Sequence, residues 1–423
     1  GEIDDVEGSG AEPGWKTTVC RQPRRVLGAA LIAGRFDRVS AERGSLDCSV
    51  YAGPEVRVDA LAVLDDAAQA HHFCRTHYGS DGFGTLRAVV SRRVGESFHA
   101  GDATVVLTAE DCDATAAGFA EIARCVAQIW WGGTGTGRWF SARPVAGEWL
   151  VEGLSGYSAW QALRTVEGRA PYLRYVERLR CPPTIDSPMK TQTLLDRFGS
   201  PPEARPFARV RGPYVAHMLG ERVGHDAFAQ ACRRVLDAHR CSAISYTALL
   251  HEVGLVAEAD LDEMCRVWFD RGGTFDYALS SVSVEQGRAL VAVANEGDIP
   301  AFTPMRVALV TDAGTRVHEV TPGLHGGTFA LTLDGSLRRA ALDPFFDTAD
   351  MRRANNVWPR RHWPTAIHPA PDGAVYVDRK SEWPLAEADE VRVWRPGAKY
   401  PAVPEAGLVL HAGDPHARGT GAS

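Results

Sequence analysis

The chain has 423 residues, enough for two or three domains, and its 45% apolar and 23% charged residues are ordinary for a globular protein. The formal net charge of −7 excludes nucleic acid as the main partner, because binding phosphates needs a strong basic excess. No apolar run approaches the roughly 20 residues that span a bilayer. We therefore expect no membrane span in this chain, although one could lie upstream of residue 1.

The nine cysteines are dispersed over residues 20–265 and form no CxxC pair. An odd, scattered set favours reduced thiols over a disulfide framework and predicts a cytoplasmic protein. Only four of the 46 cationic residues are lysines, a skew typical of a GC-rich bacterial genome. The chain begins at Gly1 instead of Met, so we expect that its natural N-terminus is missing.

The first half of the chain reads as alternating strands and helices. An acidic, Gly- and Pro-containing stretch over residues 1–18 predicts a linker, and short β-like runs follow over 25–58. Apolar residues at helical spacing predict a helix over 58–78, and two apolar runs predict buried strands at 86–90 and 103–107. A further helix is predicted over 113–131, with Asp113 as its N-cap and Gly132 and Gly133 ending it.

The second half changes from helices to strands. Helices are expected at about 148–165, 213–238, 243–252 and 258–268. Alternating apolar runs over 273–357, separated by Gly, Asp and Pro, predict a small antiparallel β-sandwich. A Trp-, Pro- and Arg-rich extension over 358–423 contains one more expected strand, near 390–394.

Two neighbouring segments carry a resemblance to a known family. Residues 121–133 read EIARCVAQIWWGG, and residues 147–160 read GEWLVEGLSGYSAW. This pair resembles the two active-site helices of the gluzincin aminopeptidases, the membrane alanyl aminopeptidase and leukotriene-hydrolase family. Residues 211–228 and 342–356 resemble a later helical stretch of the family and the end of its β-domain.

The resemblance implies an α+β fold. A thermolysin-like metallopeptidase domain, built from a mixed sheet and helices, would occupy residues 36–272. A small antiparallel β-sandwich would follow over 273–357. Residues 1–35 would then hold a linker and the remnant of the family's N-terminal β-domain. Some bacterial relatives carry membrane-transporter segments upstream of this region.

The zinc site of the family is where this sequence departs from it. Family members bind zinc through two His four residues apart on one helix and a Glu on the next, and a Glu beside the first His activates water. Here the two His positions hold Arg124 and Gln128, and the general base position holds Cys125. The position of the tyrosine that stabilises the family's reaction intermediate holds Arg209, and only the third ligand survives, as Glu152. Because a guanidinium has no lone pair to give, we expect no zinc and no other cofactor at this site.

Two classes of function remain open at this point. The first is an inactive homologue that acts as a binding or scaffold protein for an unknown protein or peptide ligand, with a buried Arg124–Glu152 ion pair in place of the metal. The alternative is a metal-dependent aminopeptidase or other metallopeptidase, or a repurposed enzyme that uses the same cleft. The candidate cleft residues are Glu152, Tyr157, Tyr214 and Trp131.

Several other patterns have both a structural and a functional interpretation. Cys125 is a buried small side chain or a thiol nucleophile. The cluster of His71, His72, Cys74 and His77 is a solvated helix end or a weak metal site. The tryptophans between residues 130 and 160 form core or line a groove. The arginine pairs at 352–353 and 360–361 contact solvent, another domain or an acidic partner. Residues 95–99 lie where the family grips a peptide N-terminus but lack its pattern.

Overall fold

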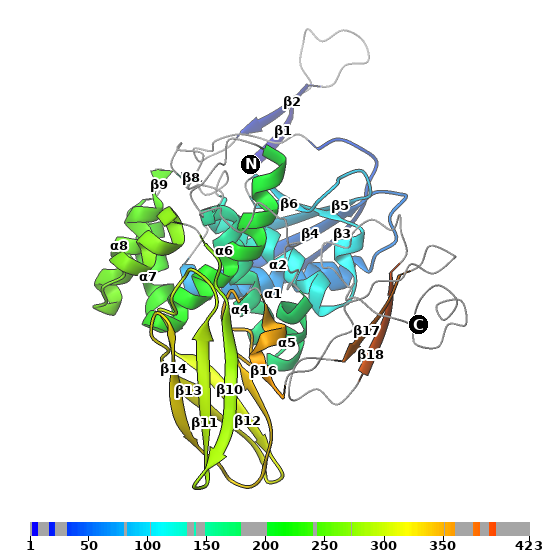
Figure 1. Cartoon of the computed structure of the whole chain (residues 1–423). Coiled ribbons are helices and arrows are strands. Elements are labelled where there is room, and N and C mark those ends of the chain that lie inside the picture. Colours follow the sequence, from blue (N-terminus) through cyan, green and yellow to red (C-terminus); the bar gives the residue numbers. More distant parts are fainter. Residues whose placement is uncertain are drawn as a thin grey trace. The chain divides into compact units, whose positions relative to one another are not determined.

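The computed structural model comprises two compact units, Gly1–Val166 with Asp226–Ala259, and Glu167–His225 with Asp260–Ser423 (Figure 1). None of the described helices is long and apolar enough to cross a membrane. The structure describes residues 2–6, 17–21, 32–79, 83–101, 103–132, 139–140, 149–178, 201–239, 243–271, 273–350, 352–359, 375–380 and 389–394. Outside these ranges lie most of the expected β-like run at 26–32, the Gly/Thr loop after residue 132 and the arginine pair at 360–361.

The first unit is built on a mixed sheet of five strands in the order β3-β4-β5-β7-β6. The neighbours β4, β5 and β7 run parallel, and the two outer strands are antiparallel. Apolar runs in β5 and β7 are buried, which confirms both predicted strands. The strands are β3 (Asp37–Arg43), β4 (Leu46–Ala52), β5 (Thr85–Ser91), β6 (Phe98–Gly101) and β7 (Thr104–Thr108), and a separate hairpin joins β1 (Glu2–Val6) to β2 (Thr17–Arg21).

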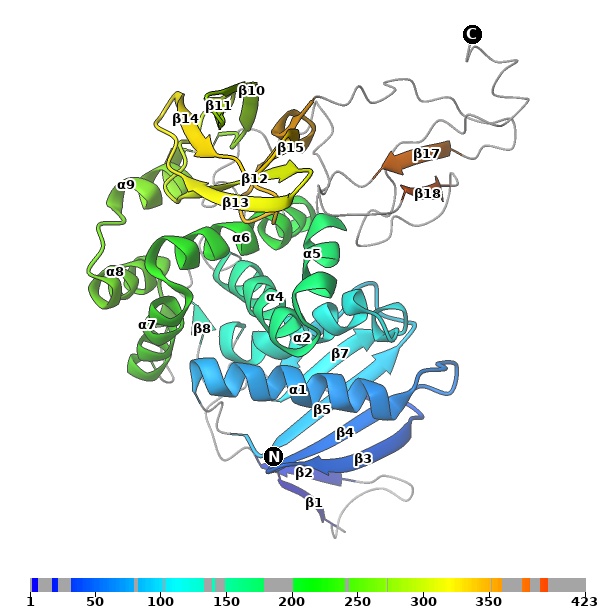
Figure 2. The same ribbon diagram turned by 90° about the horizontal axis from the view of Figure 1, so that it is seen from below.

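Helices α1 (Ala60–Tyr78) and α2 (Ala116–Trp131) pack against strands of this sheet and against each other (Figure 2). Both confirm predicted helices. The predicted N-cap of α2 is wrong, however. The hydroxyl of Thr115, not Asp113, accepts the backbone N–H of Gly118, while Asp113 accepts a hydrogen bond from the Thr115 hydroxyl.

The remaining elements of the first unit follow α2 in the sequence. A π-helical turn, η2 (Trp149–Gly153), leads into α4 (Leu154–Val166), which packs on α2. Helix α7 (His225–Ala238) belongs to this unit from Asp226 onward. The other elements are the short helix η1 (Glu110–Cys112), α8 (Tyr246–Ala257) and the paired strands β8 (Trp139–Phe140) and β9 (Ala243–Ile244).

Aromatic side chains fill the core of this unit. Trp130, Trp131, Trp149 and Trp160 are each at most 1% exposed, which confirms the core interpretation for these four. The indole of Trp130 donates to the carbonyl of Gly79. The side chain of the fifth residue of the set, Trp139, lies outside the described residues.

Helix α6 differs from expectation at both of its ends. The sequence predicts one helix over 213–238, but the structure has α6 (Pro201–Val223) and then α7, separated by Gly224 at φ +90°. A left-handed glycine ends a helix, because the ladder of backbone hydrogen bonds cannot continue through it. The other helices are α5 (Arg169–Arg178), the single turn α9 (Asp262–Cys265) and the π-helical turn η4 (Arg266–Arg271).

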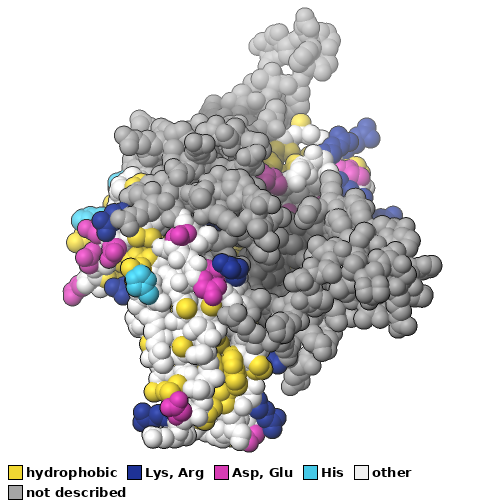
Figure 3. All heavy atoms as spheres, viewed as in Figure 1, with side chains coloured by type: hydrophobic (Ala, Val, Ile, Leu, Met, Phe, Trp, Pro, Cys, Tyr) yellow, Lys and Arg dark blue, Asp and Glu magenta, His cyan; other side chains and the backbone are white. Residues whose placement is uncertain are grey.

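Two antiparallel sheets occupy the region in which a β-sandwich is expected. Their strand orders are β10-β11-β14 and β13-β12-β15-β16, and β10 contacts β15 and β16 of the other sheet. Figure 3 shows apolar side chains on the visible face of these sheets, with a few charged side chains among them. The strands are β10 (Tyr277–Glu285), β11 (Arg288–Asn295), β12 (Met305–Thr311), β13 (Gly314–Val320), β14 (Gly326–Thr332), β15 (Leu337–Leu342) and β16 (Val357–Trp358), the last preceded by the turn η5 (Arg353–Asn356).

A final hairpin pairs β17 (Val375–Lys380) with β18 (Asp389–Trp394), which confirms the strand expected near 390–394. Taken element by element, the described chain combines helices with mixed and antiparallel sheets and is therefore an α+β protein.

Candidate functional site

Helix α2 presents a buried polar row on one of its faces. Glu121, Arg124 and Gln128 follow one another at spacings of three and four residues, so they lie on the same side of the helix. All three are no more than 6% exposed, as is their neighbour Cys125, in a helix whose other buried residues are apolar. Charged side chains are almost never buried to this degree unless they are paired.

Arg124 is paired through all three nitrogens of its guanidinium. Its Nε donates to Glu121 at 3.0 Å, and its Nη1 donates to Oε2 of Glu152 at 3.2 Å. Its Nη2 donates to the backbone carbonyl of Ser97 at 2.8 Å. The ion pair between Arg124 and Glu152 that the sequence predicts is therefore confirmed, and Glu121 is a second anionic partner that the sequence analysis missed.

Gln128 forms a hydrogen bond with the other carboxylate oxygen of Glu152. Its Nε2 donates to Oε1 of Glu152 at 3.2 Å, while its Oε1 accepts the backbone N–H of His99 at 2.9 Å. Both carboxylate oxygens of Glu152 are thus engaged, one by the guanidinium and one by the amide. Residues 95–99, which match no family pattern, contact this cluster through the backbone of Ser97 and His99.

The electrostatics of the cluster fix Arg124 in its charged form. Burial alone would lower the pKa of its guanidinium, but Cys125, Glu121 and Glu152 raise that pKa well above its ordinary value. Two carboxylates face this guanidinium, so Arg124 is a fixed cation enclosed by anionic partners.

These residues do not fit a zinc ion. Zinc in this kind of site needs three protein ligands with free lone pairs, from imidazole, thiolate or carboxylate groups. Of the three side chains that the resemblance aligns with zinc ligands, one is a guanidinium and another is an amide whose oxygen already accepts a backbone N–H. The third, Glu152, already bonds to the other two.

The other predicted site residues have their own surroundings. Trp131 donates its indole N–H to the hydroxyl of Ser158 at 3.0 Å, and Tyr157 packs edge-on against Phe228. Tyr214, in the second unit, donates its hydroxyl to the carbonyl of Val176 at 3.4 Å. Trp131, Tyr157 and Tyr214 are no more than 5% exposed. Arg209 lies half-buried in α6.

The histidine cluster of α1 is only partly the solvated helix end that the sequence favours. His71 is buried with its ring edge-on to Trp130, and Cys74 is buried too, whereas His72 is exposed. His77 stacks on Phe73, and its Nδ1 lies 2.9 Å from the carbonyl of that residue. Each described member of this cluster is therefore accounted for by local packing or by solvent.

Arg353 corrects the interpretation of the arginine pair at 352–353 as a surface feature. Its guanidinium is buried, donates to Asp343 at 2.8 Å and lies over the ring of Phe346. Only Arg352 is exposed, and it pairs with Asp276.

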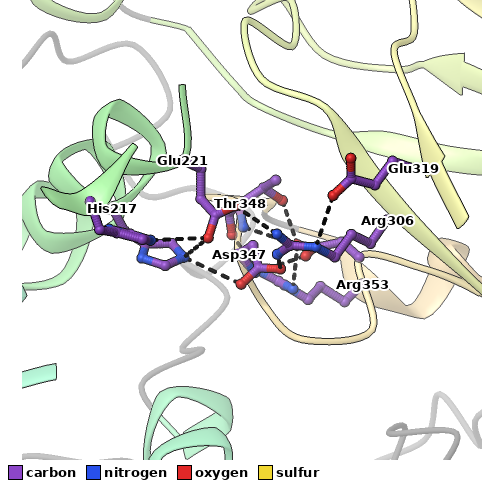
Figure 4. A network of polar contacts seen from close by, with 9 residues as sticks. His217, Glu221, Arg306, Glu319, Asp347, Thr348 and Arg353 are labelled. Carbon is purple, nitrogen blue, oxygen red and sulfur yellow. Dashed lines mark hydrogen bonds and ion pairs between the residues drawn. The ribbon is translucent and has the colours of Figure 1, made fainter. Parts of the chain in front are cut away.

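A second polar cluster, in the second unit, was not singled out from the sequence (Figure 4). His217 and Glu221 on α6, His225 at the start of α7 and Asp347 come together with Arg306 of β12. Within the described part of the chain, His217, Glu221 and His225 are the set of three His, Cys, Asp or Glu residues whose side-chain ligand atoms approach closely enough to hold a metal ion. The spacing His217-x3-Glu221-x3-His225 is the signal that could have revealed them.

Both carboxylates of this cluster are ionised at neutral pH. Burial acts to raise the pKa of Glu221, but the hydrogen bond with His225 and the charges of His217 and Arg306 lower it to about 2. Burial likewise opposes ionisation of Asp347, and His217 and Arg306 lower its pKa to about 2.

Comparison with solved structures gives a likeness in fold to an aminopeptidase. The chain resembles the crystal structure of Legionella pneumophila aminopeptidase A in complex with aspartic acid, with a TM-score of 0.54 and 11% sequence identity. The match covers 75% of this chain but only 38% of the Legionella enzyme. No protein-family description matches the sequence, and no curated protein does. At this identity the likeness shows an aminopeptidase-like fold and nothing finer.

Proposed function

We propose that this protein is a zinc-less homologue of a gluzincin aminopeptidase that no longer hydrolyses peptides and acts as a binding or scaffold protein for a protein or peptide partner. The observation that carries the proposal is the direct hydrogen bonding of Arg124 and Gln128 to the two oxygens of Glu152. In the family these three positions share a metal ion, whereas here they share hydrogen bonds.

Chemistry supports the loss of hydrolysis. A metallopeptidase relies on zinc to polarise the carbonyl and to lower the pKa of the attacking water. Arg124 supplies a positive charge but no site at which water could bind and be deprotonated, and Cys125 offers no carboxylate to act as general base. With that machinery lost, recognition of a partner is the role left for an inherited peptidase fold.

The domain limits of 36–272 for the peptidase-like part and 273–357 for the β-domain belong to the same proposal. So does the cytoplasmic location, which rests on the dispersed cysteines.

The test compares zinc bound by the native chain with zinc bound by a chain whose family motif is restored. The restored variant carries Arg124→His, Cys125→Glu and Gln128→His, and Glu152→Gln in the native chain is the matched control. Every chain compared carries His225→Gln, so that the second cluster does not contribute to the count, and the native chain of this test is the one with that change alone. Elemental mass spectrometry after zinc loading and gel filtration measures the stoichiometry.

We expect less than about 0.1 zinc per chain with the native residues and about one in the restored variant, since two His and one Glu then meet. Zinc in the native chain that Glu152→Gln removes would overturn the proposal, and this comparison stands even if the restored variant fails to fold.

A further inference from the structure

The second cluster combines two helix turns and a loop. His217 and Glu221 lie four residues apart on α6, so they share a face of that helix. His225 follows four residues later, after the left-handed Gly224, and its Nε2 lies 3.1 Å from Oε1 of Glu221. Asp347 comes from the loop after β15, and its Oδ1 lies 3.2 Å from Nε2 of His217.

Three of these side chains, His217, Glu221 and His225, place ligand atoms within 4.8 Å of one another, and Asp347 adjoins them through its contact with His217. The distance from Nε2 of His217 to Oε1 of Glu221 is 3.8 Å. Ligands about 2.0–2.2 Å from a tetrahedral zinc ion lie roughly 3.3–3.6 Å from one another. The three separations of 3.1–3.8 Å between imidazole nitrogens and carboxylate oxygens are close to this range.

The outer oxygens of the two carboxylates have a different partner. Arg306 donates from Nη2 to Oε2 of Glu221 at 2.7 Å and from Nη1 to Oδ2 of Asp347 (Figure 4). Each carboxylate therefore gives one oxygen to the arginine and keeps the other directed at the histidines. Carboxylates that bind metals are commonly oriented in this way by a hydrogen bond to their second oxygen.

The backbone of Asp347 is also fixed by a hydrogen bond. Its N–H donates to Oδ1 of Asp343 at 2.8 Å, and Asp343 is fixed by the buried Arg353. The carboxylate of Asp347 is thus positioned before any ligand arrives, which reduces the cost of assembling a site.

Arg306 brings one fixed positive charge to two carboxylates, Glu221 and Asp347. The side chains of Glu221, Asp347 and His225 are 18%, 16% and 31% exposed, so a solvated ion can reach the cluster, whereas His217 is fully buried. A divalent ion would add positive charge beside these carboxylates.

We infer that His217, Glu221, His225 and Asp347 form a structural zinc site that ties the junction of α6 and α7 to the loop after β15, with Arg306 orienting both carboxylates. Two imidazole nitrogens with carboxylate oxygens suit Zn²⁺ better than Mg²⁺ or Ca²⁺, which take oxygen ligands at higher coordination numbers. The site lies in the second unit and is separate from the Arg124 cluster of the first.

The test is zinc binding to the full chain, stripped with a chelator and then titrated with Zn²⁺ in competition with a chromophoric chelator. The variant is His225→Gln, at the partly exposed ligand, and the matched control is His251→Gln, at an exposed histidine of α8. We expect about one zinc per chain in the native protein and in the control, and an affinity at least 10- to 100-fold lower in His225→Gln.

Glu152→Gln separates this inference from the proposed function, because it changes the other cluster only. It should leave zinc affinity unchanged. Loss of zinc in Glu152→Gln with retention in His225→Gln would overturn both ideas at once, whereas absence of zinc from the native chain would overturn this one alone.

Cobalt substitution gives a second measurement that needs no variant. Co²⁺ in the native chain should show the intense visible absorption of a four-coordinate centre. A weak, six-coordinate spectrum, or no binding, would contradict the tetrahedral site.

Discussion

At the scale of single residues, Glu152 shows how a buried carboxylate is satisfied without a metal ion. Its two oxygens accept from Arg124 and from Gln128, the two side chains that the resemblance aligns with the family's histidines. Each of these side chains supplies a donor to one oxygen of Glu152. A buried carboxylate satisfied at both oxygens avoids the cost of desolvation without a partner.

The Arg124 cluster predicts a large effect of removing the guanidinium. Arg124→Ala should lower the free energy of unfolding by about 3–5 kcal/mol, because it leaves Glu121 and Glu152 buried without a cation. Urea denaturation followed by tryptophan fluorescence measures the loss. The matched control is Arg43→Ala, which breaks the ion pair of Arg43 with Asp65 at side-chain exposures of 37% and 47%. That control should cost no more than about 1 kcal/mol, and equal losses in the two variants would contradict the account.

A pH effect is expected at Asp350. Burial raises the pKa of its carboxyl from 3.8 to about 6. The folded state therefore prefers the protonated form, so the contribution to stability is present below about pH 4 and is lost as the pH rises through about 6. Between pH 5 and pH 7.5 the native protein should lose about 1.5 kcal/mol relative to the non-titrating variant Asp350→Asn.

Urea unfolding of both proteins across this pH range measures the difference. A difference that stays constant, or one that grows in favour of the native protein as the pH rises, would show that Asp350 is ionised in the folded state well below pH 6.

At the scale of elements, Gly224 determines where one helix stops and the next begins. It has φ +90°, and a Cβ placed on it would meet no other atom within 4 Å. Replacing it with Ala should therefore cost about 1 kcal/mol through backbone strain alone, with no steric clash, and Asn should cost less because it tolerates this conformation. The change in urea midpoint gives the value.

Gly84 offers a matched control for that substitution. A Cβ on Gly84 also meets nothing within 4 Å, but its φ lies outside the left-handed region. Gly84→Ala should be neutral or should stabilise the fold by about 0.4–1 kcal/mol, because it restricts the unfolded chain. Destabilisation of equal size at both glycines would mean that the left-handed φ of Gly224 is not the cause.

The elements that the sequence predicted well are those with strong apolar periodicity. Helices α1 and α2 and strands β5 and β7 were predictable because their buried residues repeat at the spacing of their own backbone. The break at Gly224 was missed because apolar spacing continues on both sides of it. The start of α6 was missed because Pro206 and Pro213 argue against a helix that the structure nevertheless continues through them.

The candidate sites, too, were predictable from the sequence only in part. The Arg124–Glu152 pair could be inferred because both residues occupy positions marked by the resemblance. The contact of Arg124 with Glu121 follows from their spacing of three residues and was overlooked, whereas the contact with Ser97 depends on a segment 27 residues away, which no local pattern encodes. The second cluster needs Arg306 and Asp347, which lie 85 and 130 residues from their partners Glu221 and His217.

At the scale of the whole molecule, likeness in fold does not determine chemistry. The chain resembles an aminopeptidase in fold at 11% identity, and the residues that we propose stand at a former zinc position bond to one another. The described residues with a geometry suited to a metal belong to a different unit and to different helices. A zinc ion bound to this protein would therefore not be evidence of peptidase activity.

Hydrolysis of aminoacyl-coumarin substrates by the full chain, with and without added zinc, tests the central claim most directly. We expect no release of coumarin above the rate in buffer under either condition, for a panel covering acidic, basic and apolar residues. Release that zinc stimulates, that a chelator abolishes and that Glu152→Gln removes would contradict the account and show that the inherited site is still a working metallopeptidase.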